Sequence, residues 1–155
     1  MNRFRLALHA CLCMMPLLYG ICPAQNLPNS IYAEVFGNAG GYSINYERIV
    51  FENLSVRAGF MFVSDASAFP ALVNYRIYAG ENYFSVGAGI LSWHIYSNYK
   101  IMNDESLEGS GLMFTARINY TLVARNGLFL GISFTPFLYN GKIIPFGGFS
   151  FGKEF

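Results

Sequence analysis

Cysteine, histidine, charge and long apolar runs are all scarce in this 155-residue chain. Each scarcity excludes a kind of site or a class of structure. The three cysteines, Cys11, Cys13 and Cys22, lie within the first 24 residues, so residues 25–155 hold no disulfide and no cysteine metal site. Charged residues make up 12% of the chain, which is well below the roughly 25% of typical soluble domains. Ten basic and nine acidic residues leave no basic footprint for nucleic acid.

The chain also lacks a candidate transmembrane helix beyond its first 24 residues. No later stretch reaches the roughly 18 consecutive apolar residues that such a helix needs. Even so, apolar residues make up 54% of the chain and aromatic residues 17%. A composition this apolar, without such a helix, favours a β-barrel that faces lipid.

The first 24 residues have the layout of a secretory signal peptide. Arg3 and Arg5 precede an apolar stretch, and a small residue, Ala24, stands at the expected cleavage site. The alternative is a retained membrane anchor, which is disfavoured because a proline interrupts the apolar stretch. We therefore expect a signal peptide over 1–24 and one outer-membrane β-barrel domain over 25–155.

After this leader, apolar residues recur with a period of two. In LSVRAGFMF (54–62) every second residue is apolar, and GLMFTARINYTLV (111–123) repeats the pattern. The alternation predicts strands, and turn-forming residues divide the chain into eight of them. The predicted strands cover residues 31–36, 42–48, 53–62, 69–79, 83–97, 111–124, 128–138 and 144–155. A single long strand over 31–48 would reduce the count to seven.

An even number of strands brings both chain ends to one side, as in single-chain outer-membrane barrels. The sequence therefore predicts an all-β fold, an eight-stranded antiparallel up-and-down transmembrane β-barrel. Short periplasmic turns are expected at residues 48–53, 80–82 and 125–127, and external loops at 37–41, 63–67, 98–111 and 139–142.

The less apolar face of these strands is expected to line the barrel interior. It carries three acids and three bases, namely Glu34, Glu47, Glu154, Arg57, Arg76 and Arg117, with Asn45, Asn74, Asn119 and Ser150 between them. Buried charges must be paired, and an eight-stranded barrel is only just wide enough for its own side chains. We therefore predict a salt-bridged, closed lumen, with a narrow channel as the alternative.

Aromatic residues are expected where the barrel meets the membrane–water boundary. The related segments INYER, VNYRI and INYTL place Tyr46, Tyr75 and Tyr120 on the apolar face, near the periplasmic strand ends. A ring with a polar tip suits that position. Trp93, the single tryptophan, is assigned to the same aromatic girdle.

The chain ends in GGFSFGKEF, with Phe149, Phe151 and Phe155 in one alternating phase. This ending resembles the C-terminal signal of outer-membrane barrels, which the barrel-assembly machinery reads. In size and strand count the chain resembles the small barrels typified by OmpX and the OmpA transmembrane domain. Its GGYSINYER segment is similar to small outer-membrane barrel proteins of Bacteroidetes-type bacteria. These resemblances imply the bacterial outer membrane, with its lipid and lipopolysaccharide, but no established activity.

Few residues offer catalytic chemistry. His94 is the one histidine beyond the leader, so neither a multi-histidine metal site nor a cofactor is expected. Ser92 and His94 share a strand face, and Glu105 follows in the next loop. This set resembles the Ser-His-acid triad of outer-membrane lipid A deacylases. Because serine and histidine stand in the reverse order here, catalysis is the lesser hypothesis.

The predicted function is that of a small outer-membrane barrel that presents short surface loops for structural or interaction roles. A surface enzyme that modifies lipid A is one alternative. Another is a soluble periplasmic, lipocalin-like barrel, which would carry apolar residues inside and polar residues outside. The GxW motif typical of lipocalins is absent near the first strand, and the sequence names no partner for the loops.

Overall fold

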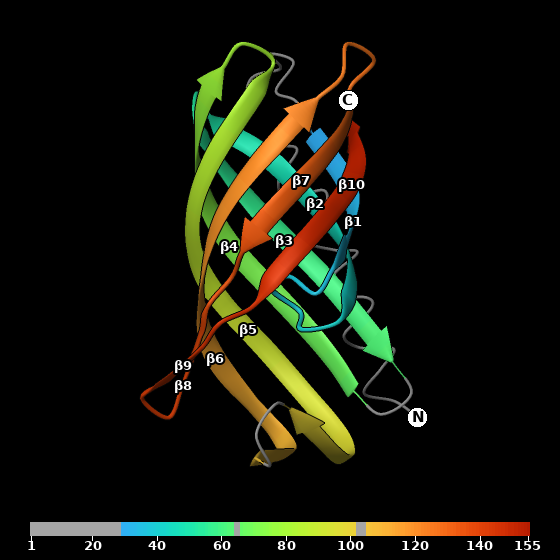
Figure 1. Cartoon of the computed structure of the whole chain (residues 1–155), viewed down its shortest axis with the longest axis vertical. Helices are drawn as coiled ribbons and strands as arrows, with labels where there is room; N and C mark the ends of the chain where they lie inside the picture. The colour runs from blue at the N-terminus through green and yellow to red at the C-terminus, as the bar shows by residue number, and fades with distance from the viewer. Residues whose placement is uncertain (1–28, 64–65, 102–104) are drawn as a thin grey trace.

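The computed structural model describes the backbone of residues 29–63, 66–101 and 105–155, and their side chains except at 96–101 and 105–108. The predicted signal peptide lies outside these residues, so the division at Ala24 stays a prediction. Within the described ranges the chain forms ten strands in one antiparallel sheet (Figure 1). The strands are β1 (Asn29–Val35), β2 (Tyr42–Phe51), β3 (Leu54–Val63), β4 (Ala66–Ala79), β5 (Asn82–Ile101), β6 (Glu105–Val123), β7 (Leu128–Phe134), β8 (Phe137–Tyr139), β9 (Lys142–Ile144) and β10 (Gly147–Glu154).

The ten strands make eight barrel strands among the described residues, because two barrel strands are each interrupted by a proline. β7 and β8 pair with β6 in one continuous register, broken only around Pro136. β10 and β9 pair with β7 and β8 in the same way, broken only around Pro145. Proline has no N–H to donate to the ladder. The backbone bond from Thr135 N to Phe146 O, 2.8 Å long, bridges the two breaks.

The barrel closes between its first and last strands. β1 pairs with both β2 and β10, and the β5–β6 pairing completes the ring. The Asn29 N–H donates to Phe155 O at 2.7 Å, and the Phe155 N–H donates back to Asn29 O at 2.8 Å. The predicted eight-stranded antiparallel fold is confirmed, and residues 31–48 belong to two strands rather than one.

The two ends of the barrel differ in their connections. At the turn end, uppermost in Figure 1, residues 52–53, 80–81 and 124–127 join successive strands. At the opposite loop end, the β8–β9 hairpin turns through Asn140 and Gly141, which have φ angles of 48° and 75°. Asn-Gly is the preferred pair for such two-residue hairpins, because both central residues adopt positive φ.

The longest predicted loop, 98–111, is partly a strand pair, so that expectation was wrong for the backbone. β5 continues to Ile101 and β6 starts at Glu105, and these two residues stand opposite each other. The register shifts between Ile95 and Tyr99, which marks a bulge or irregularity. Polar composition suggested a loop here, but antiparallel neighbours satisfy their backbone groups by pairing whatever their side chains.

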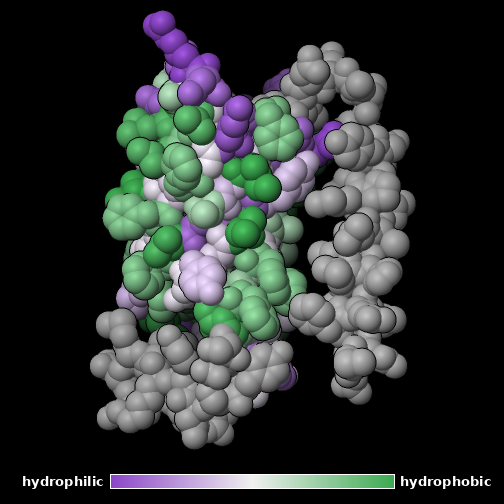
Figure 2. Space-filling model, turned by 90° about the vertical axis from the view of Figure 1, so that its right-hand side faces the viewer, coloured by the Kyte–Doolittle hydropathy of each residue, from purple (hydrophilic) through white to green (hydrophobic). Residues whose placement is uncertain are grey.

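The outward face of the wall is apolar. Large hydrophobic side chains are exposed on every barrel strand, and Figure 2 shows them over most of one side, with hydrophilic residues gathered mainly toward the turn end. Phe114, Phe149 and Phe155 leave 63%, 65% and 65% of their surfaces exposed. Within the described residues no helix is long and apolar enough to cross a membrane.

Candidate functional site

The six predicted interior charges all point into the barrel. Five of them are buried, namely Glu34, Glu47, Arg57, Arg76 and Arg117, while Glu154 is half-buried. Strand alternation places them there, because side chains at every second position share a face. They form two clusters, stacked along the barrel axis between mid-barrel and the turn end.

The first charged cluster centres on Glu34. The Arg57 guanidinium forms an ion pair with Glu34 through Nη2 and Oε2, and both side chains are 0% exposed. Arg117 Nη2 reaches the other carboxylate oxygen, Oε1, at 3.2 Å. The Ser133 hydroxyl also donates to Oε1, at 3.3 Å. One carboxylate thus lies between two guanidinium groups.

The second charged cluster centres on Arg76. Its Nη2 lies 2.9 Å from Glu47 Oε1, and its Nη1 lies 3.1 Å from Glu154 Oε1. The Ser55 hydroxyl donates to Glu47 Oε1 at 2.5 Å. The guanidinium carbon of Arg76 also lies 4.4 Å from the centre of the Tyr83 ring, within cation–π range. One guanidinium therefore lies between two carboxylates, the reverse of the first cluster.

Tyr32 connects the two charged clusters. Its hydroxyl donates to Glu47 Oε2 at 3.1 Å, and its ring lies 5.3 Å from the guanidinium carbon of Arg57. Two bases and one acid in the first cluster balance one base and two acids in the second. The interior charges therefore sum to zero, as buried charges require.

The predicted polar residues between the charges have different roles. Asn45 Oδ1 accepts hydrogen bonds from Arg57, at 3.2 Å from Nε and 2.8 Å from Nη2. Asn119 Oδ1 accepts from Arg117 Nη2 at 3.1 Å. Asn74 is buried, but neither atom of its amide has a hydrogen-bond partner among the described residues. Ser150 is buried on the same inward face.

The 36–41 loop turns into the barrel, which corrects the prediction of an external loop at 37–41. Asn38 is fully buried, its Nδ2 donates to Thr115 Oγ1 at 2.7 Å, and its Oδ1 accepts from Arg57 Nη1 at 3.0 Å. Gly37 permits this inward path, because a Cβ there would overlap the Glu34 carboxylate. Sequence reasoning missed Asn38. Its only signal was an amide set among glycines, which is also typical of a surface turn.

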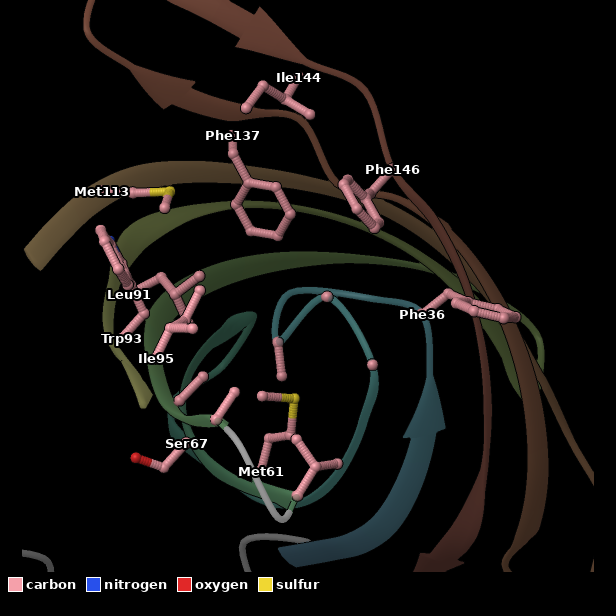
Figure 3. A pocket seen from close by; sticks show the side chains of 16 residues that line it. Phe36, Met61, Ser67, Leu91, Trp93, Ile95, Met113, Phe137, Ile144 and Phe146 are labelled. Carbon is pink, nitrogen blue, oxygen red and sulfur yellow. The ribbon is translucent and has the colours of Figure 1, made fainter. Parts of the chain in front are cut away.

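Beyond Asn38, toward the loop end, the barrel interior is apolar. It contains a cavity of about 400 Å³, which we call the loop-end chamber. Ala39 of the inward loop contributes to its lining, which Figure 3 shows from close by. Among the described residues no charged side chain belongs to that lining. The principal lining side chains are Met61, Leu91, Trp93, Met113, Phe137 and Phe146.

Trp93 lines this chamber, so its assignment to the aromatic girdle was wrong. It is only 7% exposed and packs edge-on against Tyr139, with ring centres 6.1 Å apart. The strand phase explains this position, because Trp93 alternates with the outward-facing Ser92 and His94. Its Nε1 is buried and has no hydrogen-bond partner among the described residues. The sequence did contain a signal for this position, because Leu91 and Trp93 are two residues apart and so share the face opposite Ser92 and His94.

The three girdle tyrosines lie on the outward face. Tyr75 and Tyr120 are 52% and 40% exposed, and Tyr46 is half-buried. The Tyr46 hydroxyl donates to Asn29 Oδ1 at 2.7 Å. The Tyr75 hydroxyl accepts from Asn53 Nδ2 at 3.3 Å, which places it at a turn-end connection.

The phenylalanines of the predicted assembly signal share one outward face. Phe149 and Phe151 belong to β10, and they are exposed along with Phe155. Lys153 stands in the same outward phase near the strand end, where a long side chain can extend its charge toward water. The position of this row suits a lipid-facing strand.

The structure brings together only part of the proposed triad. Ser92 is exposed and His94 is half-buried, and both lie on the outward face of β5. Glu105 begins β6, but its side chain is not among those described, so the triad remains a prediction. In the part of the chain that the structure describes, no group of three or more His, Cys, Asp or Glu residues could hold a metal ion.

Comparisons with known proteins address the architecture. No protein-family model and no curated protein sequence matches the chain. The N-terminal β-barrel domain of Pseudomonas aeruginosa OprF matches with a TM-score of 0.63 and 14% identity, over 86% of this chain and 100% of that domain. The fold is that of a small outer-membrane β-barrel. The Yersinia pestis outer membrane protein Ail, in a phospholipid bilayer nanodisc, matches with a TM-score of 0.48 and 9% identity, over 83% and 98% of the two chains.

Proposed function

We propose that this chain is a bacterial outer-membrane β-barrel with a closed, ion-paired interior, which presents its loops at the cell surface for structural or interaction roles. The observation that carries the proposal is the distribution of polarity across the wall. Charged side chains are buried inside, and large apolar side chains are exposed outside. A wall of this kind is stable in a bilayer, where the outward face meets hydrocarbon.

The same distribution argues against the soluble, lipocalin-like alternative. That alternative requires polar residues outside, whereas Ile44, Phe62 and Leu130 leave 65%, 52% and 59% of their surfaces exposed. In water, such a continuous apolar surface would promote association. The predicted signal peptide, the OprF-like fold and the outward row of phenylalanines all favour export and insertion into the outer membrane. Lipid, lipopolysaccharide and the barrel-assembly machinery are the partners that this location implies.

The interior geometry favours a barrel that does not conduct ions. The two charged clusters fill the barrel from mid-height to the turn end, and Asn38 covers the first cluster from the loop side. Neutral, mutually paired charges leave no excess of one sign to select an ion. The narrow channel is therefore the weaker alternative.

Membrane insertion can be tested by cell fractionation and by gel migration before and after heating. We expect the full chain in the detergent-extracted outer-membrane fraction, with a shift in migration on boiling, because folded barrels resist the detergent. Recovery in the soluble periplasmic fraction would overturn the proposed location.

The closed interior can be tested by reconstituting the purified protein in planar lipid bilayers. We expect the wild type to give no steady single-channel current. The matched variant Asn38→Ala removes the hydrogen bonds of Asn38 to Thr115 and Arg57, so currents confined to that variant would locate the block at the 36–41 loop. Large, stable currents from the wild type would contradict the closed interior.

A further inference from the structure

The barrel wall is incomplete at the loop end. β1 pairs with β10 as far as Val35, which stands opposite Phe149, and the chain then turns inward at Phe36. Among the described residues, β9 is an edge strand that pairs only with β8. Backbone pairing therefore stops between β9 and the 36–41 loop, and we call this unpaired part of the wall the lateral gap.

Two local features of the sequence produce this lateral gap. Pro136 and Pro145 interrupt neighbouring barrel strands at facing positions in the register, so neither supplies an N–H to hold the ladder there. Past them, the β8–β9 hairpin diverges from the barrel wall (Figure 1). On the other side of the gap, Gly37 lets the loop enter the interior, which removes the chain that would have continued β1.

The loop-end chamber lies directly behind this gap. Its lining includes Phe36 and Gly41 from the loop side, and Ile144 and Phe146 from the side of β9 and β10. Figure 3 shows Phe146 beside Phe137, Phe36 farther to one side, and the Ser67 hydroxyl turned away from the centre of the chamber. The cavity of about 400 Å³ is within the range of small-molecule sites, roughly 300–1,000 Å³.

The part of the chamber that Met113 lines stands at the level of the apolar outer wall. Met113 points into it, while its neighbours Leu112 and Phe114 point outward and are 57% and 63% exposed. Phe69, outward on β4, and Leu138, outward on β8, extend the same band around the barrel. A bilayer would therefore place hydrocarbon chains outside the wall at the height of an apolar cavity inside it.

We propose that the loop-end chamber takes up one acyl chain of a membrane lipid, which enters sideways from the bilayer through the lateral gap. This inference rests on the membrane location proposed above. The apolar lining matches a hydrocarbon chain, and no charged side chain among the described residues lines the chamber to hold a polar headgroup inside it. An acyl chain that enters through the lateral gap does not have to pass the two charged clusters.

Trp93 provides a direct test, because it is the single tryptophan of the chain and it lines the chamber. The full-length barrel would be folded into vesicles of phosphatidylcholine that carries bromine atoms at mid-chain, and into matching unbrominated vesicles. Bromine quenches indole fluorescence at short range. We expect Trp93 emission to be at least about twofold lower in the brominated vesicles.

The matched variants are Ala68→Leu and Ala71→Leu, which add the same side chain to opposite faces of β4. Ala68 lines the chamber and stands opposite Trp93 in the register, whereas Ala71 faces outward. We expect Ala68→Leu to lose most of the quenching and Ala71→Leu to retain it. Each variant is compared with itself in unbrominated vesicles, which removes changes in intrinsic emission.

Equal quenching in the wild type and Ala68→Leu would overturn the proposal, because bromine would then act only through the wall. Quenching by free bromododecanoic acid, but not by the brominated phospholipid, would overturn the assignment to a membrane lipid. If Ala68→Leu fails to fold, Ala39→Leu reduces the same chamber from the loop side. Every sample is also tested for heat-shifted migration on gels, which reports whether the barrel has folded. A barrel that is folded but shows no quenching contradicts the acyl-chain site and leaves the proposed membrane location standing.

Discussion

The two halves of the barrel interior follow different physical rules. Toward the turn end, Glu34, Arg57 and Arg76 are buried with specific partners at hydrogen-bonding distance. Toward the loop end, Leu91, Trp93 and their neighbours surround a cavity. A buried charge requires a partner of opposite sign in a defined position. An apolar lining needs no such partner, because its side chains carry no charge to pair.

The boundary between the halves is one inward-turned residue. Asn38 pairs with Arg57 on the charged side and with Thr115 across the barrel, and the next residue, Ala39, already lines the chamber. Asn38 therefore lies between the charged half and the apolar half. One narrow barrel thus places paired charges on one side of this residue and an apolar cavity on the other.

The largest expected effect is in the charged half. Glu34→Ala leaves the Arg57 and Arg117 guanidinium groups without their shared carboxylate. The free energy of unfolding should fall by about 3–5 kcal/mol, the cost of breaking a buried ion pair. Urea unfolding in lipid vesicles measures it. Glu52→Ala, at an exposed turn position, is the control, and an equal effect there would contradict the network.

Truncating a side chain in the apolar half should lower the free energy of unfolding by a smaller amount. Met61→Ala should cost about 2 kcal/mol, the low end for truncating a buried methionine, because the side chain already borders a cavity. Met61→Leu keeps the volume and should cost less than about 1.5 kcal/mol. The same unfolding assay applies. A loss for Met61→Ala equal to that for Glu34→Ala would remove the distinction between the halves.

Within the charged half, removing an ion-pair partner should lower the free energy of unfolding less for residues nearer the turn end. The Glu154 side chain is 19% exposed, and Arg76 keeps Glu47 when Glu154 is removed. Glu154→Ala should therefore cost about 1 kcal/mol or less, as for solvent-accessible ion pairs. Repeating the unfolding measurement in high salt should shrink that loss further, whereas the loss in Glu34→Ala should persist.

The smallest effect is expected outside the wall. Ser92→Ala alters an exposed side chain of the outward face and should change the free energy of unfolding by about 0.5 kcal/mol or less. Mass spectrometry should find the same lipid A in cells with and without the protein. A missing acyl chain that returns with His94→Ala would instead establish the surface enzyme.

Much of the charged half could be predicted from local alternation. Arg57 and Arg117 each stand at the inward phase of a period-two strand, so their shared face required no knowledge of the fold. The balance of three acids and three bases also indicated pairing. The particular partners could not be predicted, because Glu34 and Arg117 are 83 residues apart and meet only across the closed barrel.

The apolar cavity at the loop end could not be predicted from the sequence, and the reason is physical. Met113 stands at an inward position, but its outward neighbours Leu112 and Phe114 are apolar too. Periodicity cannot separate two faces of equal polarity. For Trp93 the phase relative to the polar Ser92 and His94 did point inward, and the assignment to the aromatic girdle ignored that phase.

The sequence by itself determined the strands, the closed antiparallel order and the face that carries the charges, because a period of two and turn residues act locally along the chain. Only the tertiary structure decided that Asn38 enters the barrel, that Trp93 lines a chamber, and that strand pairing stops at β9. The inward path of the 36–41 loop depends on closure, which brings Gly37 beside Gly148. Contacts between residues so far apart in the chain exist only after the last strand has paired with the first.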